Sequence, residues 1–138
     1  MRPETQVWLD DAEYDLQSAR TMLDAGRYFF VVFMCHLAVE KTLKAIIVER
    51  NAIEPPKIHN LVRPATRAGL AVPPEHAPAL DELNNMSVVT RYPDGRRALA
   101  GTLTADRALA IYERALELSQ WLRKRMPSSP PSNATSQS

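Results

Sequence analysis

Apolar residues recur at helical spacing along most of this chain. In residues 4–25 they fall at intervals of three and four positions, which is the period of a single buried helix face. This stripe consists of Trp8, Ala12, Leu16, Ala19 and Leu23. Thr5 is a suitable N-cap for the helix, and Gly26 is a suitable residue to end it. Because the next helical segment starts directly afterwards, the two segments are expected to form an antiparallel hairpin.

Residues 27–50 contain neither proline nor glycine, and they begin with apolar residues on every side. A helix that is apolar all round has to be covered all round, either by its own core or by a partner. The same segment carries His36, Glu40 and Lys44 at intervals of four, so these side chains share one ridge. The ridge is either a paired structural network or a site for proton transfer.

Two further amphipathic helices are expected in the second half of the chain. Apolar residues recur at helical spacing in residues 75–89, and Thr104 is a suitable N-cap for a last helix. The first stripe is Ala79, Leu80, Leu83 and Met86, and the second is Ala105, Ala108, Leu109, Tyr112, Leu116, Ser119 and Leu122. Together with the hairpin, these helices predict an all-α fold, an antiparallel up-and-down bundle of four or five helices.

The segments between the helices are rich in proline and glycine. Residues 57–74 are expected to form a connector with a short helix near 60–68, and residues 91–104 are expected to form a loop. Residues 127–138 are almost entirely proline, serine and other polar residues, which predicts a disordered tail. The chain is therefore expected to be one helical domain over residues 1–126, followed by this tail.

Composition and charge narrow the class of protein. Apolar residues make up 45% and charged residues 24% of the 138 residues, and the formal net charge is only +1. This is the balance of an ordinary globular domain and not of a protein that coats nucleic acid. The single cysteine, Cys35, excludes an internal disulfide, and because it lies in an apolar run it is expected to be a buried core thiol and not a nucleophile. Neither a signal peptide nor a membrane span is recognisable, so a cytoplasmic protein that does not bind membranes is expected.

The strongest local concentration of charge is the segment RYPDGRR at residues 91–97. Its arginines are Arg91, Arg96 and Arg97, and its single acid is Asp94. A solvated basic loop is the simpler interpretation. The alternative is a phosphate site, because arginine binds phosphate through two parallel hydrogen bonds. Since Pro93 keeps Tyr92 out of helical geometry, Arg91 and Tyr92 are expected to project from a helix end.

Signatures of standard catalytic or metal sites are missing from the sequence, so we predict no metal and no cofactor. Two histidines are candidates for proton transfer, His36 on the ridge and His59 after the connector begins. The structural alternative for His59 is to lock a turn through a backbone carbonyl. The structural alternative for the ridge is a network of Asp15, Glu40 and Lys44, with Arg91 as a further partner for either carboxylate.

Four short motifs occur in an order that resembles the HEPN domain, the "higher eukaryotes and prokaryotes nucleotide-binding" domain. The matching positions are Asp15 and Leu16; Ala38, Glu40, Lys41, Lys44 and Ala45; His59, Asn60 and Leu61; and Arg91, Tyr92 and Pro93. The resemblance covers roughly residues 5–125. It implies a bundle of four or five helices that is usually a homodimer and that often works with a minimal nucleotidyltransferase.

The resemblance implies two classes of function. Many HEPN proteins are metal-independent ribonucleases, often toxins of toxin–antitoxin pairs, in which the RNA 2′-OH is the nucleophile and a cyclic phosphate is left. Others bind a nucleotide, RNA or a partner without catalysis. The ribonuclease signature is an arginine followed, after four to six residues, by a histidine, and no arginine in this chain precedes a histidine at that spacing.

A tyrosine, Tyr112, follows Arg107 where the ribonuclease signature would have its histidine. A phenol with a pKa near 10 is a poor base at neutral pH. We therefore expect a non-catalytic or weakly active homodimer that binds RNA, a nucleotide or a partner, with a toxin ribonuclease as the alternative. In the alternative His59, His36 and Arg91 are the tentative catalytic residues. The expected phosphate-binding residues are Arg91, Tyr92, Arg96, Arg97 and Lys44.

Overall fold

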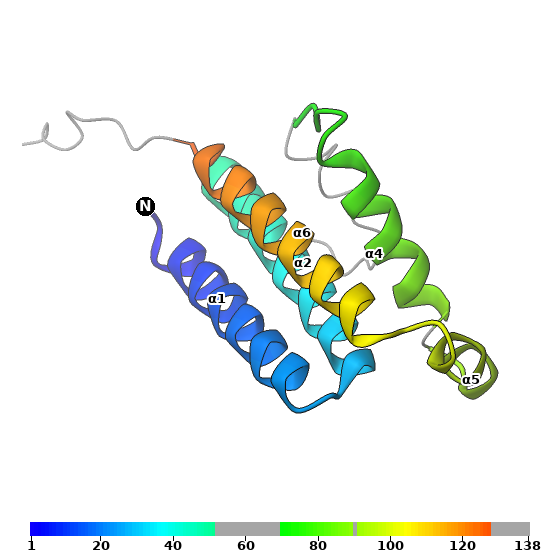
Figure 1. The fold of residues 1–138 in the computed structure, drawn as a ribbon. Coiled ribbons are helices and arrows are strands. Elements are labelled where there is room, and N and C mark those ends of the chain that lie inside the picture. The colour runs from blue at the N-terminus through cyan, green and yellow to red at the C-terminus, as the bar shows by residue number, and fades with distance from the viewer. Residues whose placement is uncertain (52–69, 90, 128–138) are drawn as a thin grey trace, which may run out of the picture.

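The computed structural model describes residues 1–51, 70–89 and 91–127, and all the regular secondary structure in that part of the chain is α-helical. The helices are α1 (Pro3–Asp24), α2 (Tyr28–Asn51), α4 (Ala77–Val89), α5 (Pro93–Ala100) and α6 (Ala105–Lys124). Figure 1 shows that the four long helices alternate in direction along the chain, which confirms the prediction of an up-and-down helical bundle. The short helix expected near 60–68 and the tail expected beyond residue 127 lie outside the described residues.

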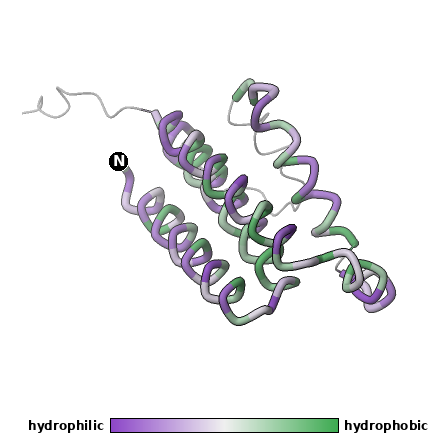
Figure 2. The backbone as a smooth tube through the Cα atoms, viewed as in Figure 1, coloured by the Kyte–Doolittle hydropathy of each residue, from purple (hydrophilic) through white to green (hydrophobic). Residues whose placement is uncertain are grey.

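Helix α2 lies at the centre and contacts α1, α4 and α6 (Figure 1). Figure 2 shows mostly hydrophobic colouring along α2, whereas α1 and α6 alternate between hydrophobic and hydrophilic positions. The α2 residues of the core are Val31, Val32, Cys35, Val39, Leu43, Ile46 and Ile47. Burying each of these larger aliphatic side chains contributes roughly 1.5–3 kcal/mol, so α2 supplies much of the stability of the bundle.

The cover over α2 is incomplete at its N-terminal end. Phe30 and Phe33 are each 52% exposed, although Val31 and Val32 between them are buried. They are three positions apart and therefore lie on the same side of the helix. The sequence allowed two ways to bury α2, in the core of this chain or against a partner. Phe30 and Phe33 form an apolar patch that the core of this chain leaves exposed.

The hairpin between α1 and α2 confirms one sequence prediction and corrects another. Gly26 has a φ of +74°, the left-handed conformation that favours glycine after a helix end. Thr5 is not the N-cap, because α1 already begins at Pro3 with Arg2 as its cap. Proline is preorganised for the first helical position, and Thr5 is instead buried, where its Oγ1 donates a hydrogen bond to Oε1 of Glu49 at 2.8 Å.

The expected loop at 91–104 contains a helix, α5, so that prediction was wrong. Pro93 occupies the first turn of α5, and Tyr92 before it is extended with φ −118° and ψ 144°, as expected for a residue that precedes proline. Thr104 caps α6 as predicted, since its Oγ1 accepts a hydrogen bond from the backbone N–H of Arg107 at 3.2 Å.

The buried side of α6 differs in phase from the predicted stripe. Ala105 and Leu109 are exposed, while Ile111 and Leu118 are buried although the stripe did not include them. The buried residues of α6 are Ala108, Ile111, Ala115, Leu118, Ser119 and Leu122. The difference arises because α6 contacts three helices, α1, α2 and α4, and its buried sector is centred between them.

Candidate functional site

One candidate group of charges lies where α1 packs against α2. Asp15 of α1 is buried, and its Oδ2 lies 2.8 Å from Nζ of Lys41 on α2. Glu40 is also buried, and its Oε2 accepts a hydrogen bond from Nζ of Lys44 at 2.8 Å. The Nδ1 of His36 lies 3.8 Å from Oε1 of the same carboxylate. We call these five residues the buried ionic face.

Lys44 is held from two sides within the buried ionic face. Besides its bond to Glu40, its Nζ lies 5.2 Å from the ring centre of Trp8, which is within the range of a cation–π interaction. The Lys44 side chain is only 12% exposed. An ammonium group engaged in this way is poorly placed to bind a phosphate from solution.

The second candidate group lies at the junction of α4 and α5, at one end of the bundle (Figure 1). Arg91 follows α4, Tyr92 is the N-cap of α5, and Arg96 and Arg97 lie within α5. All four side chains are exposed, and Tyr92 is 65% exposed. Within the described residues, none of the three guanidinium groups takes part in an ion pair or a hydrogen bond. We call these four residues the arginine corner.

A close backbone contact fixes the geometry of the arginine corner. A Cβ atom placed on Gly95 would overlap the backbone carbonyl oxygen of Val89 at the end of α4. Only glycine lets α5 approach the end of α4 this closely. Leu99, one turn later, packs against the hydrophobic core. Gly95 and Leu99 thus form the packed side of α5 and leave Arg96 and Arg97 in solvent.

The structure separates residues that the sequence grouped as one site. Lys44 belongs to the buried ionic face and not to the arginine corner. Asp15 and Glu40, which the sequence offered as partners for Arg91, are engaged by Lys41 and Lys44, and Arg91 pairs with neither. His36 is only 5% exposed, and His59 lies outside the described residues.

Arg107 and Tyr112, which imitate the spacing of the ribonuclease signature, are directed to different neighbours. The guanidinium group of Arg107 lies 3.9 Å from the carboxylate of Glu82 on α4. The ring of Tyr112 instead faces Arg20 of α1, whose guanidinium carbon is 5.9 Å from the ring centre. The two side chains therefore do not converge on one reacting group in this chain.

Cys35 is placed where a nucleophile would be ineffective. Its side chain is fully buried in α2, and burial raises the pKa of the thiol to about 12. Because the thiolate is the reactive form, a thiol that stays protonated at neutral pH is inert. The expectation of a buried core thiol is confirmed.

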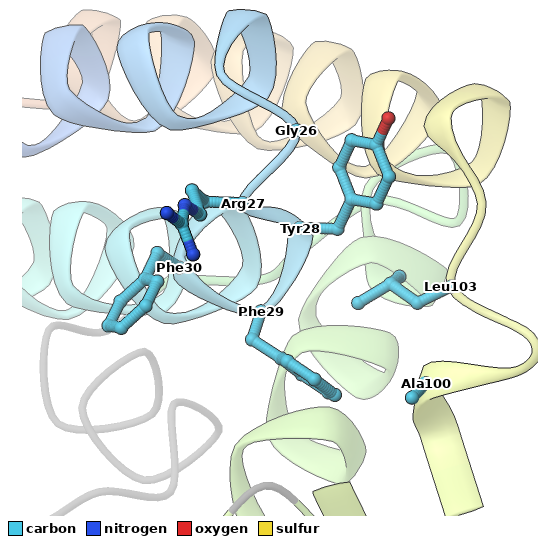
Figure 3. Close-up of a pocket in the computed structure, with 7 residues that line it drawn as sticks. All are labelled: Gly26, Arg27, Tyr28, Phe29, Phe30, Ala100 and Leu103. Carbon is cyan, nitrogen blue, oxygen red and sulfur yellow. The ribbon is translucent and has the colours of Figure 1, made fainter. Parts of the chain in front are cut away.

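Sequence reasoning missed a pocket of about 230 Å³ beside the turn between α1 and α2 (Figure 3). Its lining residues are Gly26, Arg27, Tyr28, Phe29, Phe30, Ala100 and Leu103. We call it the turn pocket. The sequence held one signal for it, an arginine directly before a helix, where serine, threonine, aspartate or asparagine is usual.

The helical bundle agrees with the class of protein that the sequence motifs suggested. The family model of the HEPN domain matches residues 5–125, and the chain belongs to the HEPN domain family. Membership of this family supports a nucleotide- or RNA-related role in general. The comparisons with curated proteins and with solved structures gave no match. In the part of the chain that the structure describes, no helix is both long enough and apolar enough to cross a membrane.

Proposed function

We propose that this protein is a non-catalytic, or at most weakly active, HEPN protein that binds RNA or a nucleotide through phosphate contacts at the arginine corner. The observation that carries the proposal is the set of exposed arginines, Arg91, Arg96 and Arg97, that form no ion pair within the described residues. Each guanidinium group presents a rigid fork of N–H donors that fits a phosphate. The exposed ring of Tyr92 adds a surface on which a base can stack.

The absence of catalysis is proposed because no arginine and histidine stand at the ribonuclease spacing. His36 is buried beside Glu40, and Tyr112 is turned toward Arg20 rather than toward Arg107. The alternative is a metal-independent toxin ribonuclease, in which His59 or His36 would move the proton of the RNA 2′-OH and Arg91 would stabilise the phosphate. In this alternative the bound RNA is cut, whereas in the proposed function it stays intact.

We further propose that the protein is a homodimer whose interface includes Phe30 and Phe33. Two exposed phenylalanine side chains on one side of α2 form an apolar patch of the kind that interfaces bury. A minimal nucleotidyltransferase is proposed as partner on the strength of the family alone. The test of that partner is whether the neighbouring open reading frame encodes such an enzyme and whether the two proteins copurify.

The binding proposal is tested with a labelled single-stranded RNA in buffer that contains EDTA. Fluorescence anisotropy measures the affinity, and a denaturing gel then measures the length of the same RNA. We expect saturable binding and intact RNA. Combined replacement of Arg91, Arg96 and Arg97 by alanine should weaken binding at least about tenfold, since hydrogen bonds to charged groups are the stronger ones.

A matched variant removes the same charge from elsewhere: Arg20→Ala, Arg114→Ala and Lys124→Ala combined. It should weaken binding less than about threefold, because only the general electrostatic attraction is reduced. Equal losses in the two triple variants would contradict a phosphate site at the arginine corner. RNA that is cut by the wild type and left intact by His59→Ala would establish the ribonuclease alternative instead.

A further inference from the structure

The turn pocket has mostly apolar and aromatic walls. In Figure 3, Tyr28 and Phe29 extend from the first turn of α2, and they are approached by Ala100 at the end of α5 and by Leu103 in the connection to α6. A cavity of roughly 150 Å³ is enough for a benzene ring, so about 230 Å³ has room for a flat system of one or two fused rings. Leu103 is only 5% exposed and forms part of an apolar floor.

Arg27 places a positive charge at the edge of this pocket, and in Figure 3 its guanidinium group points toward the Phe30 side, away from Ala100 and Leu103. Its side chain is exposed and, within the described residues, makes no ion pair or hydrogen bond. Its backbone carbonyl accepts hydrogen bonds from the N–H groups of Phe30 and Val31, at 3.1 and 3.2 Å, so Arg27 stands at the N-cap position of α2. The first turn of α2 contains no acidic residue that would neutralise the arginine.

An arginine is an unfavourable choice at this position for the helix itself. The N-terminus of a helix carries a partial positive charge, and a cation there is repelled. Arginine also lacks the side-chain oxygen with which a good N-cap residue accepts a backbone hydrogen bond. Residues that are unfavourable for the local structure are expected where a function requires them. A bound anionic group would offset the repulsion at the helix N-terminus and would supply the missing hydrogen-bond acceptor.

The turn pocket and the arginine corner are neighbours along α5. Ala100, which lines the pocket, follows Arg96 by four residues and Arg97 by three. These three residues therefore lie on the same side of the helix, about one turn or roughly 5.4 Å apart along its axis. The mouth of the pocket is therefore within reach of a nucleotide next to one that contacts these arginines.

We propose that the turn pocket binds the base of a nucleotide, with the phosphate of that nucleotide on Arg27. The inference deepens the proposed function and rests on it, because it assigns one base of the bound RNA, or a free nucleotide, to a defined place. A purine or pyrimidine ring is flat and stacks on aromatic side chains with little dependence on sequence. The phosphate supplies the negative charge that Arg27 and the start of α2 lack.

The test measures binding of AMP, of adenosine and of a short single-stranded RNA to the full-length protein by isothermal titration calorimetry. AMP should bind at one site per chain and adenosine at least about tenfold more weakly, because it lacks the phosphate. Arg27→Ala should weaken AMP to the level of adenosine. Ala100→Trp should fill the pocket and remove binding of both ligands.

Both replaced side chains are exposed, so the variants are expected to keep the fold, which the thermal melt of each variant checks. Lys124→Ala removes one positive charge at the opposite end of α6 and should leave AMP affinity within about twofold of the wild type. The inference is overturned if AMP does not bind at millimolar concentration, or if neither Arg27→Ala nor Ala100→Trp changes its affinity. It is also overturned if Ala100→Trp changes the oligomeric mass and not the affinity, since the pocket would then hold a protein side chain.

The two proposals fail in distinguishable ways. If RNA affinity falls when Arg91, Arg96 and Arg97 are replaced by alanine but does not fall with Ala100→Trp, the base pocket is overturned. The proposed function is then unaffected. If AMP binding is weakened by Arg27→Ala and by Ala100→Trp while RNA does not bind measurably, the base pocket is supported. RNA is then overturned as the ligand of the arginine corner.

Discussion

The buried ionic face and the arginine corner both concentrate charge, but they differ in whether the charged groups are paired and in whether they are exposed to solvent. In the buried ionic face each carboxylate has a lysine ammonium group 2.8 Å away, and the carboxylates are shielded from solvent. In the arginine corner three guanidinium groups are exposed and, within the described residues, unpaired. The state of pairing, more than the amount of charge, is the reason why we assign the first group to the stability of the fold and propose the second as a ligand site.

The largest expected effect comes from breaking the buried ionic face. Glu40→Ala leaves the ammonium group of Lys44, whose side chain is 12% exposed, without its carboxylate. Removing one partner of a buried ion pair costs about 3 kcal/mol in the free energy of unfolding. Urea denaturation measures this loss.

The control for Glu40→Ala replaces both partners, Glu40→Leu with Lys44→Leu. It should recover most of the stability, because a pair of apolar side chains leaves no buried charge unpaired. A Glu40→Ala protein as stable as the wild type would show that the buried ionic face contributes nothing to the fold.

The apolar patch on α2 is expected to give the next largest effect. Replacing Phe30 and Phe33 by glutamate introduces charge into the proposed dimer interface and should weaken association by about 2 kcal/mol or more. Light scattering at micromolar concentration should show a dimer for the wild type and a monomer for the variant. The monomeric variant should stay folded, since both side chains are already half exposed, but its melting temperature should no longer rise with protein concentration as that of a dimer does. A monomeric wild type would refute the dimer.

Gly95→Ala breaks the arginine corner without touching an arginine. The added methyl group collides with the Val89 carbonyl oxygen, so α5 must move away from α4. We expect a loss of about 1–2 kcal/mol in stability and weaker RNA binding. Gly101→Ala is the matched control, because a Cβ there has no neighbour within 4 Å. Equal RNA affinities for the two glycine variants would show that the position of α5 is unimportant for binding.

The smallest expected effect concerns Glu49, which joins the ends of α1 and α2. The backbone N–H of Arg2 donates a hydrogen bond to Glu49 Oε1 at 2.9 Å and, with the hydroxyl of Thr5, lowers the pKa of Glu49. A carboxylate with a lowered pKa adds stability above its unfolded pKa and loses it as the pH falls through its folded pKa. Glu49→Gln should therefore melt slightly earlier than the wild type at pH 7, and the difference should vanish in acid. A difference that stays the same from pH 7 to pH 3 would contradict this assignment.

Local signals in the sequence were sufficient for most of the fold. The spacing of apolar residues identified the long helices, and Gly26 and Thr104 marked a helix end and a helix start through their own conformations. Thr5 was misread because its partner, Glu49, lies on another helix and is not visible from local sequence. Helix α5 was misread because RYPDG is typical of a turn, whereas the packing of Leu99 against the hydrophobic core is not visible from local sequence.

The candidate sites show the same division between local and distant information. The residues of the arginine corner were identified from the local density of arginines and from Pro93 beside Tyr92, since they are near neighbours in the sequence. Lys44 was offered both with these arginines and with Asp15 and Glu40, and the structure places it in the buried ionic face, beside Glu40 and beside Trp8 of α1. The turn pocket was missed because its walls come from residues 26–30 and from residues 100 and 103, which only the folded chain brings together.

The central claim is that the arginine corner holds RNA phosphates, and the salt dependence of RNA affinity tests it most directly. For single-stranded RNA, each lost phosphate contact reduces the slope of log affinity against log salt concentration by about 0.7. The account predicts that Arg96→Ala with Arg97→Ala makes this slope shallower by about 1.4. A slope equal to that of the wild type would contradict it.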